Sequence, residues 1–394
     1  MYKYNSKEII KDDIYICLPG GEKYIEEAHK NGAKKTIKMS RPEMAKFASK
    51  LYGAPSKELK VIGITGTNGK TTITYLIAQA LVMAGYKPYV LGTINSELTT
   101  PESLDIQRIM AKHLATGGTH FVMEVSSHGI DQGRINEIEF DVKALTNITQ
   151  DHLGYHKTFE NYKNTKLSFM KESETVKIYP ENYKKVELPF KHPLPGRFNY
   201  ENLQTAYLAL KGLNISEEII KKALSKAQAP PGRFENIDEG QLFYAIVDYA
   251  HTPDGLENVL TEAKNIALDR QGKVLVVFGC GGDRDRKKRP KMGKVVNKYA
   301  DYFVITQDNP RSEDWTQITD DILEGLDLAS SFKVIHDRRE AIMDIIKKAE
   351  EKDVVMIAGK GHEDYQILAN GKIHFDDREE VRLAIRRKLD ASIN

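Results

Sequence analysis

A glycine-rich loop constrains the fold of this chain more than any other feature. Residues 63–72 read Gly-Ile-Thr-Gly-Thr-Asn-Gly-Lys-Thr-Thr and lie between an apolar run at 60–65 and a segment whose apolar residues keep helical spacing. The pattern from Gly66 to Thr71 is G-x-x-G-K-T, two residues shorter than the full phosphate-binding pattern. A strand, such a loop and a helix in register predict a nucleoside triphosphate site, because glycines let backbone N–H groups approach phosphate oxygens. A plain glycine turn is the alternative.

Within this loop the side chains suggest different roles. Lys70 has the length to reach the terminal phosphates, and the Thr71 hydroxyl suits a ligand of Mg²⁺. The residues expected to hold the nucleotide are Gly66, Thr67, Asn68, Gly69, Lys70, Thr71 and Thr72.

Composition excludes several classes of protein. The 394 residues are 40% hydrophobic and 29% charged, with a net charge of +2 and scattered Lys and Arg, so nothing favours a nucleic-acid partner. Only Cys17 and Cys280 are present, far apart in the sequence, which indicates a reducing compartment without structural disulfides. No apolar run approaches the ~20 residues of a membrane span, and residues 1–5 lack the apolar core of a signal peptide. We expect a soluble cytoplasmic enzyme, and a monomer.

Three segments follow one another along the chain. Residues 1–57 contain one strand candidate and two short helices, too little to bury a good core alone. Residues 58–230 alternate strands and helices, with a polar, proline-punctuated loop or short hairpin near 172–195, and residues 231–394 restart the alternation. The predicted fold class is α/β: a central phosphate-loop domain with a parallel sheet, a C-terminal doubly wound α/β domain and a small N-terminal α/β segment.

In the central segment, polar residues follow consecutive predicted strands. Glu124 ends the strand predicted at 119–125, where a carboxylate is well placed to bind Mg²⁺ beside Thr71. His152 follows the strand predicted at 142–147 and stands beside Asp151, which favours a role in a site. Lys166 lies in the next helix, and the residue pattern alone suggests an ordinary surface lysine.

In the third segment, four polar motifs follow predicted strands. They are 248–254, 279–285, 308–311 and 359–363. Because strand ends of a doubly wound sheet share one edge, these motifs predict a pocket for a polar, zwitterionic substrate. Arg284 and Arg311 suit bidentate binding of carboxylates.

With these motifs assembled, the chain resembles the Mur ligase family from about residue 12 onward. The motifs that carry the resemblance are 66–72, 124–128, 147–152, 196–199 with Asn202, 232–235, 248–253, 282–285, 308–311 and 359–363. The resemblance implies an ATP-dependent amide ligase of peptidoglycan synthesis: a substrate carboxylate is phosphorylated, and an amine then attacks the acyl phosphate.

The resemblance also assigns roles to individual residues. Lys70, His152 and Lys166 would be catalytic, and Thr71, Glu124, His152 and Lys166 would form the Mg²⁺ sites, with Lys166 carbamylated. Asn199, Asn202 and Asp248 would hold ATP from the inter-domain side, with Arg233 at the phosphates.

The same resemblance implies which residues form the substrate pockets. Family members with Asp-Asn-Pro-Arg at 308–311 generally take meso-diaminopimelate, whereas those that add L-lysine usually lack the arginine. The residues expected to hold the diamino acid are Arg284, Asp308, Asn309, Arg311, Gly359 and Glu363. The residues expected to hold the muramoyl-peptide acceptor are Thr99, Thr100, Ser126, Gln132 and Arg134.

Two departures from the family keep alternatives open. The first segment is about half the usual size and contains no Asp-Ser-Arg stretch, and the chain between Lys166 and Gly196 is short. A handle-free acceptor, an L-lysine-adding enzyme, a pseudomurein-type peptide ligase and a folylpolyglutamate synthase are the close alternatives. A P-loop kinase or NTPase switch would need no second α/β domain with a zwitterion pocket, and a silent regulatory subunit would not need Lys70, Glu124, His152 and Lys166.

Overall fold

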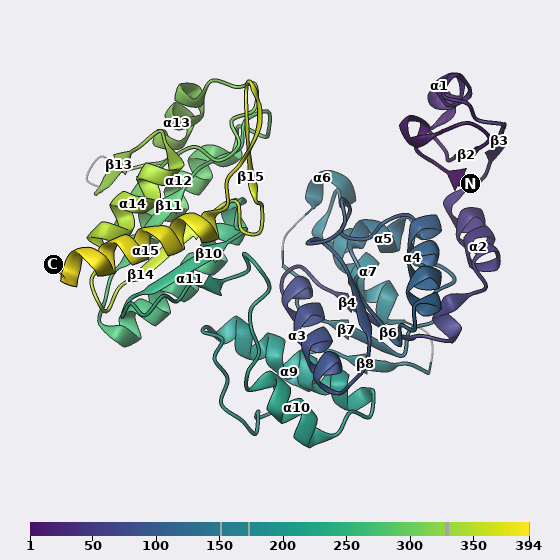
Figure 1. Ribbon diagram of the computed structural model, residues 1–394, viewed down its shortest axis with the longest axis horizontal. Coiled ribbons are helices and arrows are strands. Elements are labelled where there is room, and N and C mark those ends of the chain that lie inside the picture. Colours follow the sequence, from purple (N-terminus) through teal and green to yellow (C-terminus); the bar gives the residue numbers. More distant parts are fainter. Residues whose placement is uncertain (150–151, 172–173, 328–330, 394) are drawn as a thin grey trace. The chain divides into compact units, whose positions relative to one another are not determined.

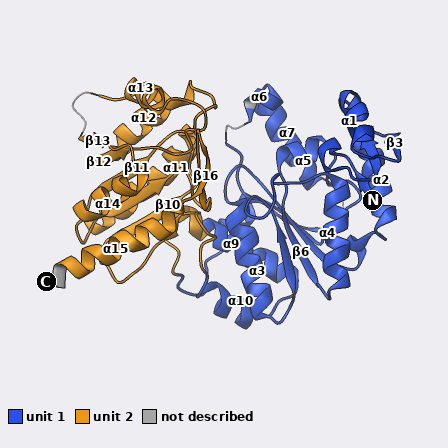
Figure 2. Ribbon diagram, turned by 45° about the horizontal axis from the view of Figure 1, so that its top comes forward, with its two compact units in different colours: residues 1–192, 201–227 blue, residues 193–200, 228–394 orange. Residues whose placement is uncertain are grey.

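A computed structural model of the chain describes residues 1–149, 152–171, 174–327 and 331–393. These residues form two compact units, which Figure 2 draws in blue and orange. Unit 1 comprises residues 1–192 and 201–227, and unit 2 comprises residues 193–200 and 228–394. Separate domains at 1–57, 58–230 and 231–394 stay a prediction.

Unit 1 is built on a parallel sheet in the order β5-β6-β4-β7-β8 (Figure 1). Its strands are β4 (Lys60–Thr65), β5 (Pro88–Leu91), β6 (His120–Glu124), β7 (Val142–Leu145) and β8 (Val176–Ile178). Ile64 of β4 lies beside Glu124 of β6 and Ala144 of β7. The loop after β4 is therefore flanked by the loops after β6 and β7, at the edge where such sheets bind ligands.

Helices cover this sheet because its strands are apolar on both faces. The helices of unit 1 beyond the first segment are α3 (Lys70–Met83), α4 (Ser103–Ala115), α5 (Ser127–Asp131), α6 (Leu153–His156), α7 (Phe159–Met170), α8 (Pro180–Tyr183), α9 (Arg197–Gly212, which begins in unit 2) and α10 (Glu217–Leu224). Ile106 of α4 and Phe169 of α7 share a core with Val61 of β4. Side chains alternate along a strand, so Ile62 faces the other side, and α3 packs against β4, β5 and β6.

The first segment is a small α/β layer within unit 1, and it packs against the rest of that unit. It contains β1 (Tyr2–Lys3), β2 (Ile14–Cys17), β3 (Lys35–Lys38), α1 (Ile25–Lys30), α2 (Arg41–Leu51) and the single turns η1 (Ser6–Glu8), η2 (Glu22–Tyr24) and η3 (Pro55–Lys57). Helix α2 packs against α4, and Leu104 of α4 joins the apolar cluster of Met44 and Ala48. The expectation that this segment needs a neighbour to complete its core is confirmed.

Unit 2 is a second α/β sheet, in the order β13-β12-β11-β14-β10-β9, with only β9 antiparallel among its described pairs. Its strands are β9 (Glu235–Asn236), β10 (Tyr244–Asp248), β11 (Val274–Phe278), β12 (Tyr302–Ile305), β13 (Phe332–Val334) and β14 (Val354–Ala358). Its helices are α11 (Pro253–Arg270), α12 (Lys288–Tyr299), α13 (Trp315–Leu323), α14 (Arg338–Lys348) and α15 (Asp377–Ile393).

Alternate residues of these strands face two separate cores. Val276 of β11 packs with α11, α12 and α13, and the next residue, Val277, packs with α14 and α15. This doubly covered sheet confirms the predicted α/β class. A two-stranded hairpin, β15 (Tyr365–Leu368) and β16 (Gly371–His374), stands outside the sheet (Figure 1).

Two parts of the chain differ from the sequence-based expectation. The stretch near 172–195 is not simply a loop or hairpin, because β8 adds a parallel strand beside β7 and α8 follows it. The hairpin β15–β16 was not expected. Among the described residues, none of the helices combines the length and the apolar composition that a membrane crossing requires.

Candidate active site

The glycine-rich loop joins β4 to α3, as its sequence predicts. Gly66 adopts φ 142°, and a Cβ there would lie 1.8 Å from the Thr146 hydroxyl, so only glycine fits beside the loop after β7. Lys70, the first residue of α3, donates from Nζ to the carbonyl oxygens of Gly66 and Thr67, both at 2.9 Å. The Lys70 ammonium therefore lies over the loop whose amides were predicted to hold phosphate.

The loop after β7 fixes the shape of the glycine-rich loop. The backbone N–H groups of Thr67 and Asn68 donate to the Asn147 carbonyl and side-chain oxygens, at 2.8 and 3.0 Å. In this arrangement the two N–H groups are bonded to Asn147 and fix the shape of the glycine-rich loop. The first N–H groups of a helix have no acceptor within it, so the start of α3, at Thr71 and Thr72, stays the predicted source of donors for an anion.

A buried carboxylate lies beside the start of α3. Glu124, 1% exposed, accepts from the Thr71 hydroxyl at 3.0 Å. The same carboxylate accepts from the N–H of Thr93 at 2.9 Å and from the Thr93 hydroxyl at 3.1 Å. Thr93 follows β5 and was not singled out from the sequence, where nothing distinguishes it from other threonines. Thr71 and Glu124 are thus brought together as predicted.

Lys166 is not a surface residue, so the interpretation drawn from its sequence pattern alone is wrong. It is 2% exposed, and its Nζ donates to the Gly66 carbonyl oxygen at 2.8 Å. The Nζ atom also lies 4.9 Å from the ring centre of Tyr162, one turn earlier in α7. Lys166 thus lies beside the glycine-rich loop, and the catalytic and metal-site role that the resemblance implies for it stays a prediction.

His152 lies in a cluster of aromatic rings at the ends of β6 and β7. It adopts φ 53°, and its ring centre is 5.0 Å from that of His128 and 6.2 Å from that of Tyr162. Burial and the neighbouring imidazoles lower the pKa of His128, and burial lowers that of His156. Asp151 lies outside the described residues. Within the described residues, no three His, Cys, Asp or Glu side chains gather closely enough to hold a metal ion.

The predicted acceptor residues surround the end of β6. The Thr100 hydroxyl donates to the Glu124 carbonyl and accepts from the Ser126 N–H, both at 2.9 Å. Arg134 donates to the Thr100 carbonyl at 2.8 Å and to the Gln132 side-chain oxygen at 2.7 Å.

Thr99 lies at the same edge, and the first segment reaches this group as well. The Thr99 and Thr93 hydroxyls are 3.4 Å apart. Arg41 of α2 pairs with the buried Glu102 at 3.0 Å, and Glu102 lies 3.4 Å from Arg134. Arg41 and Glu102 had no signal in the sequence, because only the packing of α2 on α4 brings them together.

In unit 2, the predicted nucleotide residues Asp248 and Arg233 are neighbours. Asp248 accepts from the N–H groups of Phe234 and Ala250, both at 2.7 Å. Burial raises the pKa of Asp248, while the Arg233 charge and the two N–H groups oppose the rise. The Arg233 guanidinium lies 4.8 Å from the ring centre of Tyr249, and its buried Nε has no partner among the described residues.

The two predicted asparagines of α9 fall in different units. Asn199 belongs to unit 2, where its amide donates to the Pro195 carbonyl at 2.7 Å, and Asn202 belongs to unit 1. A Cβ at Gly69 would lie 2.4 Å from the Asn202 side-chain oxygen, so Asn202 lies against the glycine-rich loop. A role of either residue in holding ATP stays a prediction.

The predicted diamino-acid residues gather after β12 and β14. Asn309 donates from its side chain to Glu363 at 2.9 Å. Gly359 adopts φ 124°, and a Cβ there would lie 2.6 Å from the Asp308 carboxylate, so the loop after β14 passes close to the loop after β12. Arg311, at φ 55°, donates from one terminal nitrogen to the carbonyl oxygens of Gly282 and Asn309.

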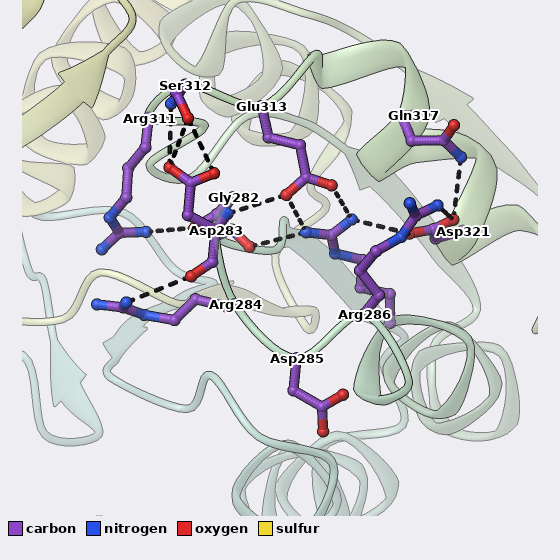
Figure 3. A network of polar contacts seen from close by, with 12 residues as sticks. Gly282, Asp283, Arg284, Asp285, Arg286, Arg311, Ser312, Glu313, Gln317 and Asp321 are labelled. Carbon is purple, nitrogen blue, oxygen red and sulfur yellow. Dashed lines mark hydrogen bonds and ion pairs between the residues drawn. The ribbon is translucent and has the colours of Figure 1, made fainter.

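A polar network holds the two arginine-bearing loops together. Asp283 accepts from the Ser312 hydroxyl at 3.0 Å, and its N–H donates to Glu313 at 2.9 Å. Glu313 in turn pairs at 2.7 Å with Arg289, whose side chain is fully buried. Figure 3 shows the side chains of Arg284 and Arg311 extending to the same side of this network. The loops after β11 and β12 thus form one support for two cationic groups.

Comparison with known proteins gives the family of the chain. The Mur ligase middle domain model matches residues 64–186, and the Mur ligase glutamate ligase domain model matches residues 232–361. The chain belongs to the Mur ligase family. This Mur ligase is therefore an enzyme of the ligase class. Its glycine-rich loop at 66–72 lies within the first matched domain, and the pocket motifs at 282–285 and 308–311 lie within the second.

Two curated relatives of this Mur ligase share the same name. Those from Clostridium tetani and Clostridium botulinum, both UDP-N-acetylmuramoyl-L-alanyl-D-glutamate–2,6-diaminopimelate ligases, are 39% identical. The alignments cover 96% and 98% of this chain and 93% and 94% of the relatives. A solved structure of the same name is 31% identical, with a TM-score of 0.64, over 100% of this chain and 95% of that one. The first alignment spans 456 residues, more than the 394 of this chain, so that relative has stretches that this Mur ligase lacks.

Proposed function

We propose that this Mur ligase uses ATP to add meso-diaminopimelate to a muramoyl-L-alanyl-D-glutamate acceptor through an acyl-phosphate intermediate. The names of its relatives support the choice of amino acid and acceptor. The observation that carries the proposal is the pocket of unit 2, where Arg311 lies beside the hydrogen-bonded pair of Asn309 and Glu363. A ligand with two carboxylates and two ammonium groups needs both cationic and anionic partners.

The phosphate chemistry belongs to unit 1. The start of α3 and the Lys70 ammonium would stabilise the charge on the transferring phosphoryl group. Thr71 and Glu124 offer only oxygen atoms, the donors that Mg²⁺ prefers, and they already lie 3.0 Å apart. A bound Mg²⁺ would neutralise phosphate charge, and we infer a second Mg²⁺ position near His152 and a carbamylated Lys166.

The acceptor carboxylate would approach from the group of residues around Thr100, Ser126 and Arg134. Arg134 is the cation of that group and suits the acceptor's carboxylates. The proposed contacts to ATP outside the glycine-rich loop itself are Asn199, Asn202 and Asp248, with Arg233 at the phosphates. An ATP-dependent reaction fits a cytoplasmic enzyme, and we propose that the protein acts there as a monomer.

The deciding experiment measures phosphate release with a panel of substrates. The panel combines muramoyl-dipeptide acceptors with meso-diaminopimelate, L-lysine, D-alanine or L-glutamate, each with and without ATP. We expect release that depends on both acceptor and amino acid and is fastest with meso-diaminopimelate. A preference for L-lysine would contradict the amino-acid assignment. Release without any acceptor would instead favour an NTPase switch.

A variant in the phosphate loop tests the ATP assignment. Lys70→Ala removes a charge that acts on the phosphoryl group in the transition state, so we expect ligation to fall by at least about 100-fold, or ~2.7 kcal/mol. The matched control is Lys87→Ala, which removes an exposed lysine after α3 and should keep full activity. Activity of Lys70→Ala within about tenfold of the parent would remove the phosphate-loop role.

A further inference from the structure

Lys360 is a buried lysine that no part of the proposed reaction uses. It follows β14, and its side chain is 0% exposed. Lysine is almost never fully buried unless its ammonium is paired. Here the Nζ atom lies 3.2 Å from the Glu363 carboxylate and 3.3 Å from the Asn309 side-chain oxygen. Both partners belong to the proposed amino-acid pocket.

Lys360 helps to fix which way the Asn309 amide points. The Asn309 side-chain oxygen accepts from the Lys360 ammonium and from the N–H of Ile367 in β15, the latter at 2.8 Å. With two donors facing the oxygen, the amide nitrogen must face away from them. It donates to Glu363 at 2.9 Å. A rotated amide would place its NH₂ against two donors and lose these contacts.

Lys360 also determines how Glu363 meets a ligand. The Oε2 atom of Glu363 accepts from both Asn309 and Lys360. An ammonium group of the substrate would then take the Oε1 atom, in a fixed direction. The Glu363 side chain is only 16% exposed, and the buried carboxylate of Asp308 lies nearby, so the Lys360 charge also offsets negative charge in the pocket.

We propose that Lys360 is a positioning residue of the amino-acid pocket, which holds Asn309 and Glu363 in the orientation that binds the substrate ammonium group. The inference rests on the proposed function of that pocket. Because the side chain is fully buried, Lys360 acts through these two residues and does not touch the ligand.

The chain offers a matched control on the other strand of the hairpin. Lys372 of β16 is exposed, and its Nζ lies 3.6 Å from the Tyr365 ring centre. Lys360 Nζ lies 5.5 Å from the centre of the same ring. The two lysines share this aromatic neighbour, but among the described residues Lys372 makes no hydrogen bond or ion pair to Asn309 or Glu363. Lys372→Met therefore removes a nearby lysine that does not position Asn309 or Glu363.

The test compares Lys360→Met with Lys372→Met in the full chain. For Lys360→Met we expect the KM for meso-diaminopimelate to rise at least about tenfold, the loss expected for one charge-assisted hydrogen bond. The KM for ATP and kcat should stay within about threefold. Lys372→Met should leave all three values unchanged. If Lys360→Met does not fold, as judged by thermal unfolding, Lys360→Gln is measured against the same criteria.

A double variant separates positioning from general support of the fold. If Lys360 acts through Glu363, then Lys360→Met should change the amino-acid KM by less than about threefold when Glu363 is already Gln. The inference is wrong if Lys360→Met leaves the amino-acid KM unchanged, or if it raises the KM for ATP as much as that for the amino acid. It is also wrong if the KM of the double variant rises by the product of the two single-variant factors. Calorimetric binding of meso-diaminopimelate needs no turnover, so the Lys360 comparison is decided even if the acceptor of the proposed ligation is wrong.

Discussion

Three lysines of this Mur ligase lie at its candidate sites, and the ammonium group of each donates to acceptors within the protein. Lys70 and Lys166 both donate to the Gly66 carbonyl oxygen, and Lys360 lies between Asn309 and Glu363. The glycine-rich pattern identified Lys70 without the structure. Lys166 had no signal in its own helix, because its burial against the glycine-rich loop arises only in the folded chain, and only the resemblance indicated a role.

We predict that Lys166 carries a carbamate in the active enzyme. A carbamate nitrogen keeps one N–H group, so the 2.8 Å hydrogen bond to Gly66 can persist while the new carboxylate supplies negative charge beside the phosphate loop. Lys166→Ala should lose most activity and regain part of it with a short carboxylate such as formate. Labelled bicarbonate should give a carbamate carbon signal in the parent protein, measured by nuclear magnetic resonance.

Lys163 provides the control for this experiment. It lies one turn earlier in α7 and is only partly buried. Lys163→Ala should keep both the activity and the carbamate signal. Full activity in a protein whose Lys166 shows no carbamate would contradict the prediction.

We predict that Arg311 binds the distal carboxylate of the amino acid. Arg311→Ala should weaken binding of meso-diaminopimelate by about 2–5 kcal/mol, because the carboxylate would be left buried without its partner. The KM for ATP should change little. Arg311 already adopts φ 55°, a strained conformation for any residue with a Cβ, so alanine adds no new backbone strain.

Two further variants make the Arg311 result specific. Arg311→Lys keeps the charge but loses the planar fork, so it should recover only part of the binding. Arg387→Ala removes an exposed arginine of α15 and should have no effect. An Arg311→Ala enzyme with unchanged amino-acid preference would show that the pocket is wrongly assigned.

At the scale of elements, a buried ion pair joins α14 to α15 and supports the loops of the pocket. Arg338 pairs with Asp377 at 2.7 Å, both side chains being 0% exposed. Arg338 also donates to the carbonyl oxygens of Gln307 and Ala358, which precede the pocket residues Asp308 and Gly359. The helix pair thus holds the ends of two strands.

Removing one partner of this pair should destabilise unit 2. Arg338→Met leaves a buried carboxylate uncompensated, so we expect the free energy of unfolding to fall by about 3–5 kcal/mol, measured by urea denaturation. Arg339 pairs with Glu380 between the same helices but is 54% exposed, so Arg339→Met should cost less than about 1 kcal/mol. Equal losses from the two variants would refute the distinction between the buried and the exposed pair.

Helices and strands whose apolar residues recur with a regular period were predictable from the sequence. Short strands that form only because they pair with a neighbouring strand were not. The apolar run predicted β4 at its observed bounds, and the helical spacing predicted a helix at 71–85, which begins one residue later and ends two residues later than α3. Strand β8 is three residues long in a polar stretch, and it exists because β7 offers an edge. The hairpin β15–β16 did have a signal, since Asn370-Gly371 is a favoured turn pair, although Gly371 pairs with Leu368 and the turn residues are Ala369 and Asn370.

The missed hairpin matters because it completes the pocket. Ile367 of β15 donates from its N–H to the Asn309 side chain and accepts at its carbonyl from the Arg311 N–H. Gln366 donates to the Asp308 carbonyl at 2.8 Å. The motif at 308–311 predicted a ligand-binding loop, but the structure was needed to reveal the strand that holds this loop in place.

At the scale of the whole molecule, we infer that the size of the first segment affects how the acceptor is recognised. Residues 1–57 form a small α/β layer whose charged link to the acceptor residues runs from Arg41 to Glu102 and then to Arg134. This layer has no Asp-Ser-Arg stretch, and the aligned relatives contain stretches that this chain lacks. A remote part of a substrate contributes binding energy only if the enzyme supplies contacts to it.

We therefore predict that the UDP group of the acceptor adds little to binding in this Mur ligase. The KM values for UDP-linked and handle-free muramoyl-dipeptides should lie within about tenfold of each other, a difference of no more than ~1.4 kcal/mol. Free UDP should not compete with the acceptor. Arg41→Ala should raise both KM values by the same factor, because Arg41 acts through Glu102 on the Arg134 end of the site, which both acceptors share. Strong competition by UDP, or a handle-free acceptor that is more than 100-fold poorer, would mean that the small first segment still recognises the nucleotide.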